Sequence, residues 1–303
     1  MLIIGLFYLI VPLFLIGLIA FKRQPNILIW IFTVISFGSV IAYFWATARW
    51  EIVSIYLRPI FPILYLIACV VGYRRIKKPE TPPSKLVLIL GISIHVILIV
   101  FFSGLNWFSL RGYITPENTI DLASPFHSGK QIVLHGGSSP FTNGHFHVKP
   151  QNYALDIVGL NKLGMRSSSI SGGSDLDNYV IYGEPVYSPI DGKILIAVDK
   201  YKDQIPPKTD VENIAGNHIL IESNGIEIFL AHFKKGSIAV KEGDIVTTNT
   251  LLGRVGNTGN TSEPHLHMHI EKDGDKNTIL NGIAIPFTID SQYLVRGDVI
   301  RVE

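Results

Sequence analysis

The stretch PHLH, residues 264–267, follows a glycine-rich segment, GRVGNTG, at residues 253–259. On a β-strand, two histidines at positions i and i+2 point to the same face and stand roughly 7 Å apart at a rise of about 3.3 Å per residue. One imidazole can then hold a metal ion while the other reaches a water molecule bound to it. The pair is therefore a candidate half of a hydrolytic metal site, although two surface histidines would show the same spacing.

Short apolar runs separated by glycine and aspartate turns dominate the chain after residue 125. Residues 219–222 and 226–230 flank Asn224-Gly225, a dipeptide typical of a tight hairpin turn. Asp191-Gly192 marks a second turn before another apolar run. Because no long helical period is visible here, we expect an all-β domain with an antiparallel sheet.

Four sequence blocks in this half resemble the lysostaphin-type zinc endopeptidases, and they occur in the order of that family. The resemblance covers about residues 143–270, and its blocks are YALD at 153–156, the hairpin at 183–194, LAHF at 230–233, and the stretch 240–267. Members of the family are bacterial enzymes that cut peptide cross-bridges of peptidoglycan. The resemblance implies a catalytic domain over 125–285 with the duplicated-hybrid-motif fold, a C-terminal tail over 286–303, peptidoglycan peptides as substrate and one Zn²⁺ ion.

The resemblance also implies a role for each matching residue. Asp156 and His267 match two zinc ligands, and His265 matches the general base that takes a proton from zinc-bound water. His232 matches the second catalytic histidine, which stabilises the oxyanion formed on the scissile carbonyl. Taken alone, a histidine that closes an apolar strand, as His232 does, is more often structural than catalytic.

The third zinc ligand departs from the family pattern His-x-x-x-Asp, because Asn152 stands four residues before Asp156. An amide oxygen is a poor zinc ligand beside imidazole. The segment NGHFH at 143–147 supplies two histidines nearby, and its likeness to some relatives favours His145. His147, Asn152 or the absence of a third ligand remain the alternatives. His269, one step further along the same strand face, is expected to line the groove or face solvent.

The first third of the chain is apolar enough to lie in a membrane. Apolar runs cover residues 2–21, 27–47, 52–73 and 86–108, and each approaches or passes the roughly 20 residues needed to cross a bilayer. Arg58, Pro59 and Pro62 interrupt the third run. A cleaved signal peptide is the alternative for the first run, but no basic segment precedes it. We therefore expect a membrane domain over 1–111 with about four transmembrane helices.

Basic residues predict how these helices are oriented. Lys22 and Arg23 separate the first two runs, and a cluster of lysines and arginines at 74–85 separates the last two. The positive-inside rule makes both of these loops cytoplasmic. The β domain then lies on the extracytoplasmic side of a bacterial cell membrane, where peptidoglycan is found.

The net charge of +2 and the single cysteine exclude two other interpretations. The basic excess lies in residues 1–111, among the membrane loops, so it is no evidence for a nucleic-acid partner. Cys69 falls within the third apolar run, so no disulfide stabilises the β domain from within. Nothing in the sequence identifies a protein partner.

Two non-enzymatic functions compete with the peptidase interpretation. A catalytically impaired protein that only binds the cell wall would explain Asn152, but it would not explain the retention of Asp156, His232, His265 and His267. A membrane sensor with an outer zinc domain is the other alternative, and no cytoplasmic effector domain is recognisable in the sequence. The zinc endopeptidase is therefore the favoured hypothesis.

Overall fold

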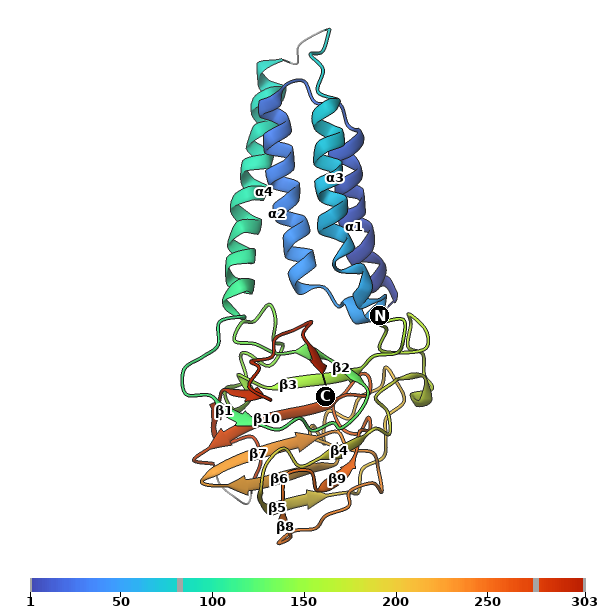
Figure 1. Ribbon diagram of the computed structural model, residues 1–303, viewed down its shortest axis with the longest axis vertical. Helices are drawn as coiled ribbons and strands as arrows, with labels where there is room; N and C mark the ends of the chain where they lie inside the picture. Colours follow the sequence, from blue (N-terminus) through green and yellow to red (C-terminus); the bar gives the residue numbers. More distant parts are fainter. Residues whose placement is uncertain (1, 81–83, 275–277, 302–303) are drawn as a thin grey trace. The chain divides into compact units, whose positions relative to one another are not determined.

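The computed structural model describes residues 2–80, 84–274 and 278–301 and divides into two compact units, Met1–Leu110 and Arg111–Glu303 (Figure 1). The first unit is helical and the second is built from β-strands. The narrower limits predicted above, 1–111, 125–285 and 286–303, remain predictions.

The helical unit contains α1 (Leu2–Phe21), α2 (Ile27–Thr47), α3 (Ile60–Arg74) and α4 (Lys85–Arg111). Three described stretches are long and apolar enough to cross a membrane: Ile27–Thr47, Ile55–Arg74 and Lys85–Arg111. The first helix contributes a shorter apolar stretch, Gly5–Phe21. A count of four transmembrane helices therefore remains a prediction.

The predicted third run, 52–73, is not one continuous α-helix. It opens with two short 3₁₀ turns, η1 (Trp50–Ile52) and η2 (Ile55–Leu57), and α3 itself begins at Ile60. Pro59 occupies the N-cap of α3, and Pro62 lies in its first turn. Proline is tolerated at these positions because the backbone N–H groups there have no partner within the helix.

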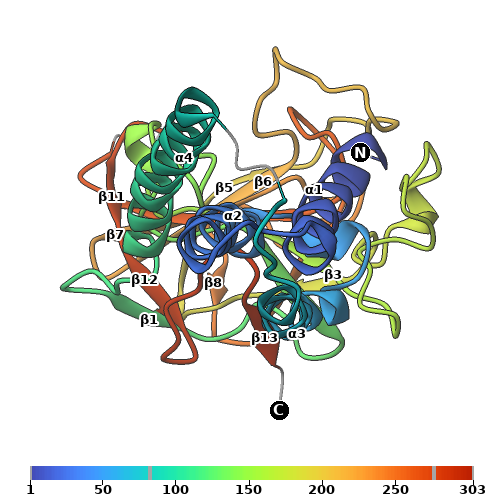
Figure 2. The same cartoon turned by 90° about the horizontal axis from the view of Figure 1, so that it is seen from above.

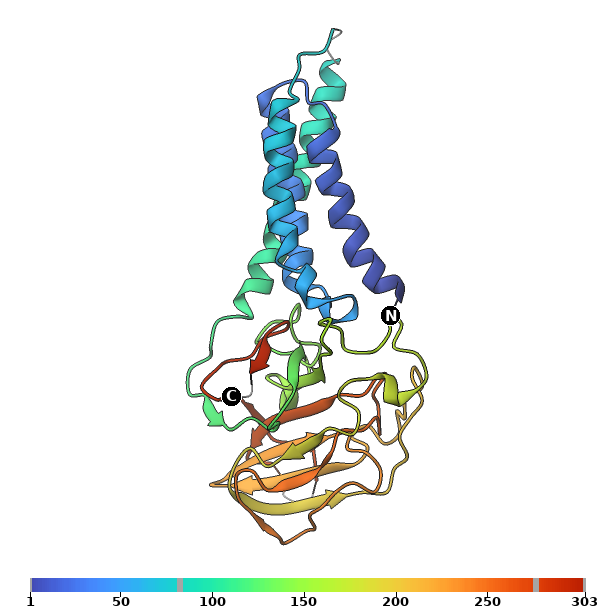
Figure 3. The same ribbon diagram turned by 45° about the vertical axis from the view of Figure 1, so that its right-hand side comes forward.

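Figures 2 and 3 show the helices of this unit from two further directions. Small and polar side chains hold these helices together. Asn106 on α4 donates to the carbonyl of Ser39 on α2 at 2.8 Å, and Ser36 Oγ lies 2.7 Å from Nδ1 of His95. Gly72 on α3 packs so closely on the backbone of Ile19 in α1 that a Cβ would collide with its carbonyl. Such contacts are typical of helix association in lipid.

The β unit confirms the predicted antiparallel sheet domain. Nine strands form the main sheet, in the order β13-β2-β3-β10-β7-β6-β5-β8 with β11 paired to β10. Their bounds are β2 (Lys130–His135), β3 (Leu155–Gly159), β5 (Gly192–Val198), β6 (His218–Ser223), β7 (Ile226–Ala231), β8 (Ile245–Val246), β10 (Leu266–Lys272), β11 (Ile283–Ile285) and β13 (Val299–Arg301). Two small pairs complete the unit, β1 (Ile120–Leu122) with β12 (Phe287–Ile289) in parallel and β4 (Pro185–Tyr187) with β9 (Leu251–Arg254) antiparallel. Two 3₁₀ turns, η3 (Lys149–Gln151) and η4 (Leu176–Asn178), lie in the connections.

Strand β10 shows how the sheet separates core from site. Its apolar side chains, Leu266, Met268 and Ile270, belong to the hydrophobic core on one face. Because successive side chains alternate between faces, His267, His269 and Glu271 share the opposite face. Strand β7 follows the same pattern, with Ile228 and Leu230 in the core and Phe229 and Ala231 in a smaller cluster beside the histidines.

A buried ion pair joins the long connection after β3 to the segment that leads into β10. Arg166 Nε lies 2.8 Å from Glu263 Oε2, and the two side chains are 1% and 3% exposed. Arg166 also donates to Ser167 Oγ at 2.8 Å. Glu263 stands two residues before His265, so this pair fixes the backbone from which the histidine projects.

We predict that Glu263→Gln destabilises the β unit by about 3–5 kcal/mol, because it leaves the Arg166 guanidinium buried without a counter-charge. The double variant Arg166→Met, Glu263→Leu should recover most of that loss, since it removes both charges together. Denaturant unfolding of the full chain, followed by circular dichroism, checks this. Equal stability of wild type and Glu263→Gln would contradict the prediction.

Candidate metal centre

Three side chains from separate elements converge on the histidine face of the sheet. Asp156 on β3 pairs directly with His267 on β10, so the two side chains emerge side by side. Asp156 Oδ1 lies 2.8 Å from His267 Nδ1, and Asp156 Oδ2 lies 2.9 Å from Nε2 of His145. One ligand atom from each residue falls within 4.8 Å of the others. The three therefore form a group able to hold one metal ion.

His145 reaches this group because a buried asparagine shapes the segment that carries it. The Asn143 amide donates to the carbonyls of Gly137, Asn152 and Ala154, each at 3.1 Å. Its Oδ1 accepts from the backbone N–H of His145 at 2.9 Å. One side chain thus ties the loop to the start of β3 and holds His145 toward Asp156.

The other two candidates for the third ligand lie outside the group. The side-chain amide of Asn152 donates to the carbonyl of Phe146, which occupies it with backbone. His147 is exposed, and its ring contacts that of Phe146. Of the three candidates, the structure brings only His145 to Asp156.

Two further histidines flank the group, and both are anchored through Nδ1 to backbone carbonyls. His265 Nδ1 lies 2.9 Å from the Glu263 carbonyl, and His232 Nδ1 lies 2.7 Å from that of Thr258. A carbonyl only accepts, so each ring carries its proton on Nδ1 and offers a lone pair at Nε2. His265 Nε2 is 3.5 Å from Asp156 Oδ1. The ring centroids of His232 and His265 are 4.7 Å apart.

The protonation states suit metal binding. Burial opposes ionisation of Asp156, but His145 and His265 outweigh it and hold the pKa of the carboxyl well below its usual value. Burial lowers the pKa of His267 to about 3. For His232, burial and the neighbouring histidines His265 and His267 lower the pKa well below its usual value. At neutral pH the site therefore presents a carboxylate together with neutral imidazoles at His267 and His232, the forms that bind metal. Burial lowers the pKa of His145, but the Asp156 carboxylate outweighs it and raises that pKa, so metal binding would displace a proton from this ring.

The donor set fits zinc. Two imidazoles and one carboxylate match the three protein ligands of catalytic zinc sites, which leave a further position for water or substrate. Calcium and magnesium prefer oxygen ligands, so the pair of imidazoles disfavours them.

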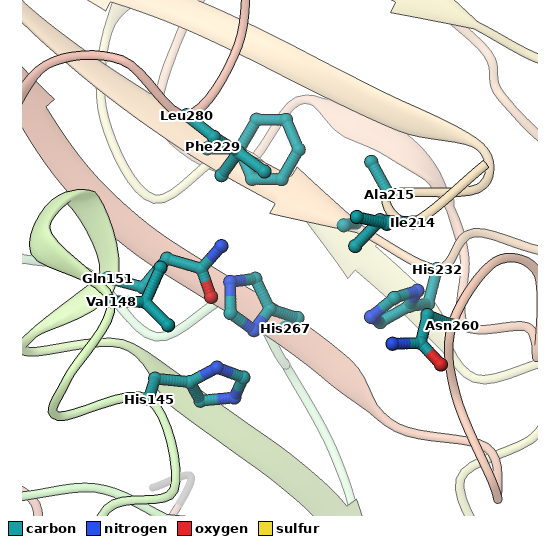
Figure 4. A pocket seen from close by; sticks show the side chains of 11 residues that line it. His145, Val148, Gln151, Ile214, Ala215, Phe229, His232, Asn260, His267 and Leu280 are labelled. Carbon is teal, nitrogen blue, oxygen red and sulfur yellow. The ribbon is translucent and has the colours of Figure 1, made fainter. Parts of the chain in front are cut away.

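A pocket of about 300 Å³ opens beside the group (Figure 4). His145, His267 and His232 line its polar side together with Gln151 and Asn260. The remaining lining residues are apolar: Val148, Ile214, Ala215, Phe229, Ala231 and Leu280. A peptide carbonyl placed in this pocket would lie next to both the group and His232.

His269, which we expected to line the groove or to face solvent, is buried. Only 1% of the residue is exposed, and its Nδ1 lies 3.0 Å from Nε2 of His267. Sequence reasoning also missed Asn143 and the Arg166–Glu263 pair. The two-residue spacing of His265, His267 and His269 was the available signal for His269. The two other features depend on distant partners and leave no local pattern.

The sheet thus carries a His-Asp-His group that could hold a metal ion, two more imidazoles and an open pocket. Residues 171–278 match the family model described as Peptidase family M23. This stretch contains His232, His265 and His267, while Asp156 and His145 precede it. Residues 171–278 therefore form an M23 family domain of the lysostaphin type.

Several solved structures resemble the chain. A zinc-containing peptidase from Vibrio cholerae is 30% identical over 31% of this chain and 24% of that chain, with a TM-score of 0.24. The catalytic domain of the prophage-encoded M23 protein EnpA from Enterococcus faecalis is 20% identical over 54% and 92%, with a TM-score of 0.33. The catalytic domain of lysostaphin from Staphylococcus simulans is 21% identical over 49% and 84%, with a TM-score of 0.29. The chain thus spans about a quarter of the Vibrio cholerae structure, and no curated protein matches it.

We predict that His145→Ala loses bound zinc as severely as Asp156→Ala or His267→Ala, because each removes one of three ligands. Asn152→Ala should keep its zinc, since the Asn152 amide is held by backbone. Elemental analysis of the purified full-length variants measures the bound metal. Zinc lost from Asn152→Ala but kept by His145→Ala would reverse the assignment.

Proposed function

We propose that the protein is a zinc-dependent endopeptidase that cleaves peptide bonds in the cross-links or stems of peptidoglycan, outside the membrane. The observation that supports this most directly is the convergence of His145, Asp156 and His267 beside the anchored rings of His232 and His265. We place the catalytic domain over residues 125–285 and treat 286–303 as its C-terminal tail. Peptidase family M23 includes peptidoglycan hydrolases.

The proposed mechanism assigns the metal to three ligands and proton transfer to His265. Zinc held by His145, Asp156 and His267 would act as a Lewis acid and lower the pKa of water. His265 accepts the proton of the attacking water at Nε2, because its Nδ1 proton is held by the Glu263 carbonyl. As water oxygen bonds to the carbonyl carbon and the C–N bond breaks, the same proton passes to the departing amine nitrogen.

His232 has a conditional role in this scheme. Its Nδ1 proton is engaged by the Thr258 carbonyl, so Nε2 accepts hydrogen bonds while the ring is neutral. The ring can donate to an oxyanion only after it has taken up a proton. We therefore place His232 as a second acceptor for the attacking water and, once protonated, as the oxyanion donor.

The pocket suggests which peptides fit. Its apolar lining includes Phe229, Ala231, Ala215 and Leu280. An uncharged side chain beside the scissile bond can pack there without losing hydration of a charge. This is compatible with cell-wall peptides that have small residues next to the cleaved bond.

The location outside the membrane is supported by the apolar stretches and by the distribution of charge. Three described stretches can cross a membrane by length and composition. Lys22 and Arg23 end the first helical run, and the basic cluster at 74–85 ends the third. We propose a multi-pass anchor in a bacterial cell membrane with these loops in the cytoplasm.

The alternative of an impaired cell-wall-binding or sensor protein is not favoured. A binding module needs neither the imidazole of His265 facing the carboxylate nor that of His232 lining the pocket. The substitution at Asn152, which suggested impairment, is offset by His145 in the geometry.

We predict that His265→Ala and His232→Ala keep bound zinc but lose most cleavage. Removing a general base costs about a hundred- to ten-thousand-fold in rate, and removing an oxyanion donor costs about a hundred- to a thousand-fold. The assay measures release of new amino termini from purified peptidoglycan, beside zinc quantification for each variant. A wild-type protein that binds zinc and cell wall but releases no amino terminus would refute the peptidase proposal.

We predict that a reporter active only outside the cytoplasm is active when fused after Phe108 and silent when fused after Lys78. The reason is the cluster of lysines and arginines around the second site, which is retained in the cytoplasm. Reporter activity in intact cells is the measurement. The opposite pattern would place the peptidase domain in the cytoplasm and remove peptidoglycan as substrate.

A further inference from the structure

Strand β10 carries a row of three buried polar side chains that leads away from the metal group. His267 Nε2 lies 3.0 Å from His269 Nδ1, and His269 Nε2 lies 3.8 Å from Glu271 Oε1. The three residues are 4%, 1% and 1% exposed. They follow each other at intervals of two residues, so the strand places them in line on one face.

The row sets the tautomer of the ligand histidine. His267 faces Asp156 with Nδ1, so this is the atom that would bind the metal and must then carry a lone pair. With a metal at Nδ1, the ring proton would sit on Nε2, where His269 Nδ1 can accept it. His269 would then carry its own proton on Nε2, at ion-pair distance from the Glu271 carboxylate.

Glu271 is itself fixed by backbone amides. Its Oε2 accepts from the N–H of Gly282 at 2.6 Å, and its Oε1 accepts from that of Leu280 at 3.3 Å. Leu280 lines the pocket. One carboxylate therefore terminates the row and also holds the segment that forms part of the pocket wall.

We propose that His269 and Glu271 are positioning residues that hold His267 in the tautomer and orientation required to bind the metal through Nδ1. This inference rests on the proposed zinc site.

Packing alone does not account for the row. Phe229 lies against His269 with ring centroids 5.0 Å apart, so an apolar side chain would suit the same surroundings. Burying an imidazole and a carboxylate there carries a desolvation cost. The row recovers that cost if it orients a metal ligand, and such outer partners typically change metal affinity about 10–100-fold.

The test compares zinc affinity among four variants of the full chain, purified in detergent, by competition with a chromogenic chelator. His269→Phe should weaken zinc binding about 10–100-fold, because His267 Nε2–H loses its acceptor. His269→Gln should restore most of the affinity, since its amide oxygen can accept the same proton. Glu271→Gln should weaken binding as well, by a smaller factor.

Glu222→Gln is the matched control. Glu222 lies on β6 in the same cross-strand row as Glu227 and Glu271, and its carboxylate accepts from Gly225 N–H at 3.1 Å. It loses the same charge without touching the histidines, so its zinc affinity should equal that of wild type. Thermal unfolding of each metal-free variant verifies the fold. If His269→Phe does not fold, the inference is tested by comparing the zinc affinity of Glu271→Gln with that of Glu222→Gln.

The inference is overturned if every folded variant binds zinc as tightly as wild type. It is also overturned if Phe and Gln at position 269 weaken binding equally, because the effect would then be one of shape. Amino-terminus release is measured separately. Zinc affinity that follows the row in a protein without peptidase activity would leave this inference standing and refute the proposed function. A wild-type chain that binds no zinc would refute both.

Discussion

The pairing of His267 with Asp156 across β10 and β3 is the constraint on which the site depends. A strand has a side-chain period of two, so a slip of β10 by one residue would turn His267 into the core, away from Asp156, and move Leu266 and Met268 to the other face. The apolar residues of β10 are fully buried, and this burial fixes the register. The hydrophobic core therefore determines where His267 and Asp156 lie, although it packs on the opposite face of the sheet.

Around this register, backbone carbonyls and amides orient the polar groups of the site. Thr258 and Glu263 anchor the Nδ1 atoms of His232 and His265, and backbone amides hold Glu271. His232 adopts φ of 69°, an uncommon conformation for a residue other than glycine. That turn carries its ring from the end of β7 toward the pocket. The rings are thus fixed before substrate arrives, which reduces the reorganisation that reaction would require.

Sequence reasoning predicted the sheet domain and the residues that the structure gathers around the metal group. These are readable because the strands, the turn glycines and the His-x-His spacing are local patterns. The contacts that hold these residues in place are harder to predict from the sequence. Arg166 and Glu263 lie 97 positions apart in the sequence and form a buried pair, and neither stands in a recognisable motif. The burial of His269 was missed because Phe229 on the neighbouring strand β7 packs on its ring, and strand periodicity alone does not show which face is covered.

Asn152 illustrates how a site can depart from a family pattern and still gather the same kinds of side chain. A ligand four residues before Asp156 would have to reach the metal from the segment that enters β3. In this chain that segment is instead held by Asn143, whose side-chain amide donates hydrogen bonds to the carbonyls of Asn152 and Ala154. The same asparagine directs His145 to Asp156 through the His145 N–H. One buried side chain, that of Asn143, therefore contacts both the Asn152 segment and the His145 segment. His145 lies beside Asp156 because Asn143 bonds the loop that carries His145 to the start of β3.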